Sequence, residues 1–187
     1  PLDVRGKFSC NDRALSEIHR ISVHTQRICM LDAYVDTPWR EQAQWWGDAR
    51  VQGRNTFFLA SDSRLLVRGV RCIARQEVPN GLTYAHAPTN CHGCIIPDFS
   101  LIWVLTIWDY FWQTGRTDLF QEQWQRIQRL LSYFCGEGLG DSGLLRYDRR
   151  YWLFLDWSDI HKTGTPALLN LWYLICLEKL ALLAGLS

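Results

Sequence analysis

The sequence carries almost no net charge, and it lacks an apolar run long enough to cross a membrane. Its 20 Lys and Arg residues nearly balance 19 Asp and Glu residues, which gives a formal charge of +1. Without a long basic run, nucleic acid is a poor candidate for the main partner. An uninterrupted apolar stretch of about 18 residues is also missing, so the sequence predicts no membrane-spanning helix and no membrane partner.

A paired cysteine pattern is missing as well. Seven cysteines are scattered without a repeating frame, which is not typical of a small disulfide scaffold and slightly favours a cytoplasmic location. The compartment is otherwise undetermined. The segment Cys91-His92-Gly93-Cys94, near His86, is the one group with metal-like spacing, but no second Cys/His pair follows it. The sequence therefore predicts no metal site and no cofactor.

What the chain does contain is enough apolar material for a folded core. Hydrophobic residues make up 48% of the 187 positions, and ten of the residues are Trp. This length suits one domain or part of a larger one. Because the numbering starts at Pro1 and not at Met, we expect residues 1–187 to be a piece of a longer polypeptide.

The apolar spacing predicts an all-α fold. Helical periodicity and caps indicate six helices, at about 12–31, 37–59, 63–76, 98–114, 119–135 and 166–184. Either Asn11 or Asp12 could cap the first helix, and Thr37 with Pro38 resembles the start of the second. The helices would pair as three antiparallel hairpins separated by two long loops. The fourth and sixth are apolar nearly all round, so we expect both to be buried on all sides.

A cluster of acids lies at the predicted start of the second helix. If that helix begins at Pro38, then Glu41, Trp45 and Asp48 share one face, and Asp36 sits in the turn just before it. Grouped carboxylates repel one another and lose hydration, so such a cluster is poor for stability. It is what a glycosidase needs, because neighbouring acids and apolar cover raise the pKa of a general acid.

Two effects oppose that interpretation. A helix N-terminus and the neighbouring Arg40 would both favour the ionised form of Glu41. A purely structural alternative also remains open, in which Asp36 caps the helix, Arg40 and Glu41 are solvated, and Asp48 pairs with a nearby arginine (Arg50 or Arg54).

The run DTPWREQAQWWGDAR nevertheless resembles the signature of bacterial α-L-rhamnosidases, glycoside hydrolase family 78. The family pattern is matched at seven positions: Asp36, Pro38, Arg40, Glu41, Trp45, Gly47 and Asp48. The likeness continues upstream at 8–12 and downstream at 96–100, 108–110 and 155–157, so it covers essentially the whole chain. It implies that residues 1–187 form the N-terminal half of an (α/α)6 toroid.

The resemblance also implies roles for these residues. Glu41 would be the general acid, while Asp36 and Asp48 would hold sugar hydroxyls and tune it, and Arg40 and Trp45 would contact substrate. The family inverts at the anomeric carbon, and its base is a Glu in the later half of the toroid, beyond residue 187. The acids Glu122, Glu137 and Glu178 do not match the context of that base. The implied substrate is a rhamnose-containing carbohydrate, and the rest of the toroid and β-sandwich domains would be partners within the full-length chain.

Three further positions carry alternatives. Asp98 is either a helix N-cap or, by the resemblance, a ligand of substrate hydroxyls. Asp156-Trp157 resembles a Gly-Asp-Trp element of the family, with Leu155 in place of Gly. Trp157 either stacks on the apolar face of a deoxysugar or packs in the core. For Trp45, a place in the pocket wall and a place in the core are equally open. The other tryptophans are assigned to packing: Trp39, Trp46, Trp103, Trp108, Trp112, Trp124, Trp152 and Trp172.

Two competing functions stay open at this point. One keeps the toroid but changes the sugar, because hydroxyl recognition depends on loop details. The other is a non-catalytic helical module that binds glycans or a protein. Aglycone, linkage preference and oligomeric state do not follow from the sequence.

Overall fold

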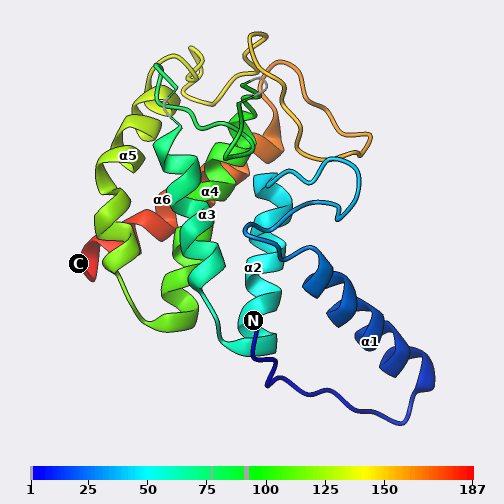
Figure 1. The fold of residues 1–187 in the computed structure, drawn as a ribbon. Coiled ribbons are helices and arrows are strands. Elements are labelled where there is room, and N and C mark those ends of the chain that lie inside the picture. Colours follow the sequence, from blue (N-terminus) through cyan, green and yellow to red (C-terminus); the bar gives the residue numbers. More distant parts are fainter. Residues whose placement is uncertain (1, 77, 91–92) are drawn as a thin grey trace. The chain divides into compact units, whose positions relative to one another are not determined.

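The computed structural model describes residues 2–76, 78–90 and 93–187, and it is all-helical (Figure 1). Six helices follow one another: α1 (Arg13–Ile28), α2 (Trp46–Ala60), α3 (Arg64–Arg75), α4 (Pro97–Thr114), α5 (Asp118–Cys135) and α6 (Ala167–Gly185). Over the described ranges, β structure is limited to isolated bridges such as Tyr84 with Ile95. The all-α prediction is confirmed, and five of the six expected helices lie where the periodicity put them.

The chain divides into two compact units, residues 1–69 and 70–187, with the boundary inside α3. In the first unit, α1 packs against α2 (Figure 1). Asp12 caps α1 by accepting hydrogen bonds from the backbone N–H groups of Ala14 and Leu15. Between the helices, the Tyr34 hydroxyl donates to Thr56 Oγ1 at 2.9 Å, and both side chains are buried. These contacts hold the segment before α2 against that helix.

The predicted start of the second helix is wrong, because α2 begins at Trp46 and not at Pro38. Residues 36–45 form a loop that is closed by a pair of hydrogen bonds. The Asp36 N–H donates to the Ala43 carbonyl, and the Ala43 N–H donates to Asp36 Oδ1, each at 2.9 Å. Gln42 has a positive φ of 51°, which a right-handed helix does not allow. The Thr-Pro pair therefore starts a turn of this loop.

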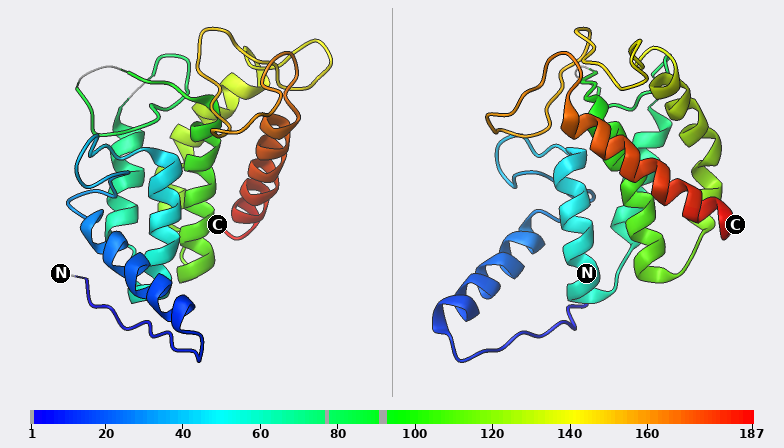
Figure 2. Two further views of the ribbon diagram at one scale, coloured as in Figure 1. Left: turned by 90° about the vertical axis from the view of Figure 1, so that its right-hand side faces the viewer. Right: turned by 180° about the vertical axis from the view of Figure 1, so that it is seen from behind.

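In the second unit, α4 lies between α5 and α6 and packs against both (Figures 1 and 2). Twelve of its residues are buried, which confirms the prediction for this helix. Gly115, at φ 71°, ends it in the left-handed conformation that helix C-termini favour. The indole N–H of Trp103 donates to the carbonyl of Val70 at 3.1 Å. Thus α4 is the central helix of this unit.

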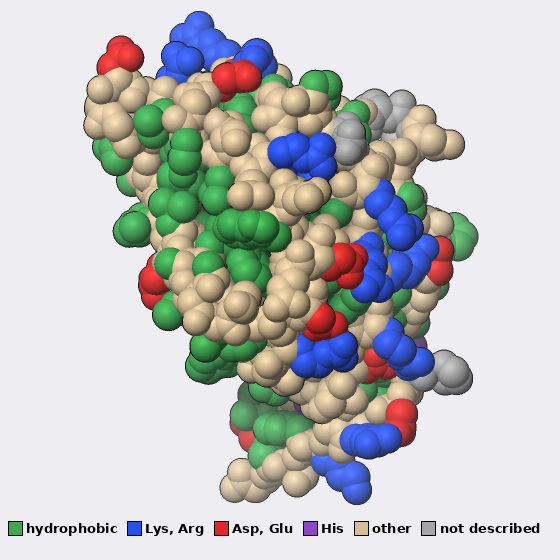
Figure 3. Space-filling view, turned by 90° about the vertical axis from the view of Figure 1, so that its left-hand side faces the viewer, with side chains coloured by type: hydrophobic (Ala, Val, Ile, Leu, Met, Phe, Trp, Pro, Cys, Tyr) green, Lys and Arg blue, Asp and Glu red, His purple; other side chains and the backbone are tan. Residues whose placement is uncertain are grey.

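The prediction that α6 is buried all round is wrong. Only four of its residues are buried, and exposed apolar side chains lie along the rest of it: Leu168, Leu171, Leu174, Ile175, Leu177 and Leu182. Figure 3 shows the face on which α5 and α6 lie, with a band of hydrophobic side chains across it. By length and composition alone, α6 could cross a membrane, contrary to the expectation of no such helix. A single helix of this kind is weak evidence for a membrane span, because core helices of soluble proteins share these properties.

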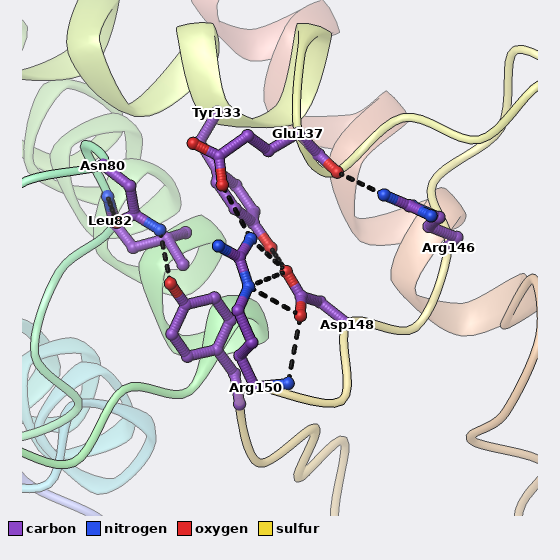
Figure 4. Close-up of polar contacts among 8 residues, drawn as sticks. Asn80, Leu82, Tyr133, Glu137, Arg146, Asp148 and Arg150 are labelled. Carbon is purple, nitrogen blue, oxygen red and sulfur yellow. Dashed lines mark hydrogen bonds and ion pairs between the residues drawn. The ribbon is translucent and has the colours of Figure 1, made fainter.

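Two long loops gather at one end of the second unit, one before α4, described at residues 78–90 and 93–96, and one before α6 at residues 136–166 (Figures 1 and 2). A polar network joins them (Figure 4). Asn80 of the first loop donates to the Tyr151 hydroxyl of the second at 2.5 Å. Asp148 accepts hydrogen bonds from Arg150 and from the Tyr133 hydroxyl, and Arg150 also pairs with Glu137. The network anchors residues 148–151 against the end of α5.

Candidate active site

The first group of candidate residues lies in the loop before α2. Glu41 is exposed, and the Trp45 indole N–H donates to its Oε2 atom at 2.7 Å. Asp36 is half-buried, and its Oδ1 atom accepts a hydrogen bond from the Ala43 N–H. Arg40, next to Glu41, is exposed. The predicted helical face of Glu41, Trp45 and Asp48 does not exist, yet a side-chain hydrogen bond still joins Trp45 to Glu41.

Asp48 lies in the first turn of α2, and the other two acids act on it directly. Its pKa is raised by desolvation and by the negative charges of Asp36 and Glu41. A hydrogen bond from backbone N–H at the helix start works in the opposite direction, because it favours the anion. The Asp48 residue is nevertheless exposed to solvent. The structure therefore brings all three acids of the sequence motif together in the first unit.

The second group belongs to the second unit and begins with Asp98. Its side chain is 2% exposed, and its carboxylate accepts from the backbone N–H of Phe154 at 3.2 Å and of Leu155 at 2.9 Å. Burial raises the pKa of Asp98 to about 6, although these hydrogen bonds and the positive charge of Lys162 oppose the rise. Asp98 is not the N-cap of α4, because Ile96 holds that position and Pro97 follows it.

The backbone that Asp98 contacts is strained. Leu155 has φ 52° and Asp156 has φ 153°, values that residues with a Cβ rarely adopt. Lys162 donates through Nζ to the carbonyl of Phe154 and, at 2.7 Å, to the carbonyl of Asp156. Leu155 thus takes a glycine-like conformation at the position where the family element has Gly.

Trp157 follows this turn and is 82% exposed, so of its two alternatives core packing is wrong. Its ring contacts Phe154 edge-on, with centroids 5.2 Å apart, and lies 5.8 Å from the ring of Trp152. Trp152 was assigned to packing but is 45% exposed. Asp156 is exposed beside these rings. The turn therefore presents a carboxylate and an open aromatic surface to solvent. The packing assignment also fails for Trp39, Trp112 and Trp124, which are exposed, whereas Trp46 and Trp103 are buried as expected.

The three later glutamates all form ion pairs. Glu122 pairs with Arg71, Glu137 with Arg150, and Glu178 with Lys179. Within the described residues, no three His, Cys, Asp or Glu side chains are grouped so that they could hold a metal ion. Cys91 and His92 of the Cys-His-Gly-Cys segment lie outside the described residues.

The residue that the sequence analysis missed is Lys162. Lysine is scarce in this chain, at three positions, and Lys162 follows the Asp-Trp pair by only a few residues. That scarcity is a weak signal. Two carbonyl contacts across a turn cannot be read from spacing, because they depend on backbone angles that the residue types disfavour.

Hairpins of antiparallel helices, with acids grouped at a loop beside one of them, are the features of a helical glycosidase domain. The family model for the bacterial α-L-rhamnosidase six-hairpin glycosidase domain matches residues 3–186. The chain belongs to this family. No relative was found among curated protein sequences.

Solved structures agree with this assignment. The GH78 family rhamnosidase of Bacillus sp. GL1 superposes with a TM-score of 0.90 at 28% identity, covering 99% of this chain and 19% of that one. A rhamnosidase from Klebsiella oxytoca with rhamnose bound gives a TM-score of 0.81 at 22% identity, with 95% and 35% coverage. The α-L-rhamnosidase from Dictyoglumus thermophilum gives 0.76 at 16% identity, with 100% and 21% coverage. The last two show the fold alone. The chain spans between a fifth and about a third of these proteins.

Proposed function

We propose that this chain carries the general-acid half of an inverting glycoside hydrolase site that cleaves terminal α-L-rhamnosyl groups. The observation that carries the proposal is the grouping of Asp36, Glu41 and Asp48 in a chain of the rhamnosidase family. Glu41 is the proposed acid. Its carboxyl is exposed, and the Trp45 indole fixes one of its oxygens while the remainder faces solvent.

The chemistry follows from this placement. Glu41 donates a proton to the glycosidic oxygen as the bond to the anomeric carbon breaks, so that the aglycone departs as a neutral alcohol. A water attacks the opposite face, activated by a carboxylate that inverting enzymes hold roughly 6.5–9.5 Å from the acid. We place that base outside residues 1–187, since Glu122, Glu137 and Glu178 are each held by a cation. Asp36 and Asp48 are the proposed ligands of sugar hydroxyls, with Arg40 at their border.

Asp156 and Trp157, both in the second unit, are also proposed to bind sugar. An exposed indole suits the apolar face of a 6-deoxysugar, whose C6 is a methyl group.

The exposed apolar side chains of α6 are the proposed contact with the remaining half of the toroid. Further domains, such as β-sandwiches, would complete a full-length protein of the size of its structural relatives.

The experiment compares the complete gene product with its Glu41→Gln variant on two α-L-rhamnosides. One substrate has a p-nitrophenyl leaving group, and the other is a disaccharide whose leaving group is a poorly acidic alcohol. A general acid contributes typically 10²–10⁴-fold to the rate. We therefore expect kcat on the disaccharide to fall by about that factor in Glu41→Gln, and by much less on p-nitrophenyl rhamnoside, because nitrophenolate departs without a proton.

The matched control is Glu17→Gln, a surface change at a residue that pairs with Arg20 on α1. It should leave both rates unchanged. Proton NMR of the first product should show β-L-rhamnose, the inverted anomer. Equal losses on both substrates would contradict the acid role of Glu41, and activity on a different glycoside alone would contradict the sugar. Glycan binding without any hydrolysis would favour a non-catalytic module.

A further inference from the structure

We propose that Asp98 and Lys162 form a clamp that holds the strained turn at residues 154–156 and thereby positions Asp156 and Trp157 for substrate. In this proposal Asp98 and Lys162 are positioning residues, and neither touches the sugar. The inference rests on the proposed function for its kinetic consequence. Its structural part can be measured independently of any activity.

The need for a clamp arises from two successive residues in conformations that disfavour a side chain. Leu155 and Asp156 both have φ in the range that glycine adopts freely. Residues in such conformations are strained and persist only where the surrounding structure fixes them. The short hydrogen bond from the Asp156 N–H to the Phe154 carbonyl, 2.6 Å, closes the turn from within. A turn of this kind would relax unless it were held from outside.

Asp98 and Lys162 hold it through different backbone groups. The carboxylate of Asp98 accepts from two successive N–H groups, and the ammonium of Lys162 donates to two carbonyls of the same turn. Asp98 is fixed on the first turn of α4, the central helix of this unit. Lys162 also lies over the Phe154 ring, 5.8 Å from its centroid. Together the two side chains contact two N–H groups and two carbonyls of residues 154–156.

The geometry of the clamp determines what the turn presents. The Trp157 N–H donates to Asp156 Oδ1 at 2.6 Å, so a change at φ of Asp156 would displace both side chains together. The Phe154 ring, which Trp157 contacts, packs edge-on against Phe99 of α4 at 5.6 Å. Upstream, the Asp148 network anchors the segment that enters the turn (Figure 4). The backbone that carries the side chains of Asp156 and Trp157 is therefore held by contacts both upstream and within the turn.

The test uses Lys162→Met and Asp98→Asn in the complete gene product, each with a matched control at an exposed residue, Lys7→Met and Asp141→Asn. Hydrogen exchange of a peptide covering residues 150–165 reports on the turn directly. We expect the amides of Phe154 and Leu155 to exchange about tenfold faster in both clamp variants and unchanged in both controls. On rhamnosides, KM should rise several-fold while kcat stays within about twofold.

A Leu155→Gly background separates the clamp from a general loss of folding. Because glycine adopts the left-handed conformation without strain, Lys162→Met should affect exchange and KM less in this background than in the parent. Unchanged exchange in Lys162→Met would overturn the clamp, as would faster exchange with an unaltered KM in an active parent. If the parent is inactive on every rhamnoside, the proposed function fails, and the exchange data alone decide whether the clamp exists.

Discussion

At the scale of single residues, the most informative group is the buried carboxyl of Asp98. Two backbone hydrogen bonds and a nearby lysine do not fully compensate for its loss of hydration, since its pKa is raised to about 6. The folded protein therefore binds a proton more tightly at Asp98 than the unfolded chain does. Burial thus disfavours the ionised form of Asp98 near neutral pH. The contacts of this carboxylate with the strained turn explain why an acid occupies a buried position.

The raised pKa predicts how stability depends on pH. A carboxyl whose pKa rises from 3.8 to about 6 on folding contributes stability that is present below about pH 4 and is lost as the pH rises through 6. A rise in pKa from 3.8 to about 6 corresponds to about 3 kcal/mol. Urea unfolding of the parent and of Asp98→Asn at several pH values should show the parent losing up to that much relative to the variant between pH 4 and 6.6. A difference that stays constant across this range would contradict the pKa.

At the scale of elements, the two long loops depend on close backbone contacts as much as on side chains. Gly81 of the first loop has φ 92°, and a Cβ there would lie 2.2 Å from the carbonyl oxygen of Arg129 on α5. The carbonyls of Gly81 and Leu82 both accept from the buried Arg126 guanidinium. The loop before α4 is therefore packed directly onto the α5 backbone.

This contact predicts that Gly81→Ala destabilises the protein far more than a matched change. Gly143 also has a positive φ, 74°, but nothing lies within 4 Å of a Cβ at that position. Gly143→Ala should cost about 1 kcal/mol, the cost of a left-handed residue alone. Gly81→Ala should cost on the order of 3 kcal/mol or more, because backbone must also move. Chemical unfolding of the two variants checks this, and equal losses would show that the Arg129 contact is not maintained in solution.

The same scale shows what a sequence can predict. Helix periodicity located α1, α3, α4, α5 and α6 within a residue or two of where they begin, because their apolar spacing and glycine stops are local signals. The start of α2 was missed because Thr37-Pro38 is an equally good signal for a turn, and the Asp36–Ala43 hydrogen bonds that decide the matter span seven residues.

The candidate site divides in the same way. The motif predicted that Asp36, Glu41 and Asp48 lie together, and the negative charges of Asp36 and Glu41 contribute to the raised pKa of Asp48. The partners of Asp98 could not be predicted, since Phe154 and Leu155 lie more than fifty residues away and contribute only backbone atoms. A contact with a backbone atom does not depend on the identity of the contacted residue, so it cannot be predicted from the sequence. Lys162, which contacts two backbone carbonyls, was missed for that reason.

At the scale of the whole molecule, the feature to explain is the apolar face of α6. Contiguous exposed leucines on one helix are uncommon at the surface of a monomeric protein and mark a surface that contacts something. The chain covers between 19% and 35% of the three solved structures described above, and its family is defined by six helical hairpins. A face of this kind fits the proposed contact with further helices of the same toroid.

Residues 1–187 expressed alone should therefore self-associate through this face. We expect light scattering to show a mass that rises with concentration, and replacing Leu171 and Leu174 with Glu should lower it, because both side chains are more than half exposed and charge opposes apolar burial. Gln125→Glu with Gln128→Glu adds the same charge to exposed positions of α5 and should leave the association unchanged. If the unsubstituted chain remains a monomer at every concentration, the exposed apolar face of α6 does not drive self-association, and the proposed toroid contact must lie elsewhere. If both double variants reduce association equally, net charge and not the α6 face controls it.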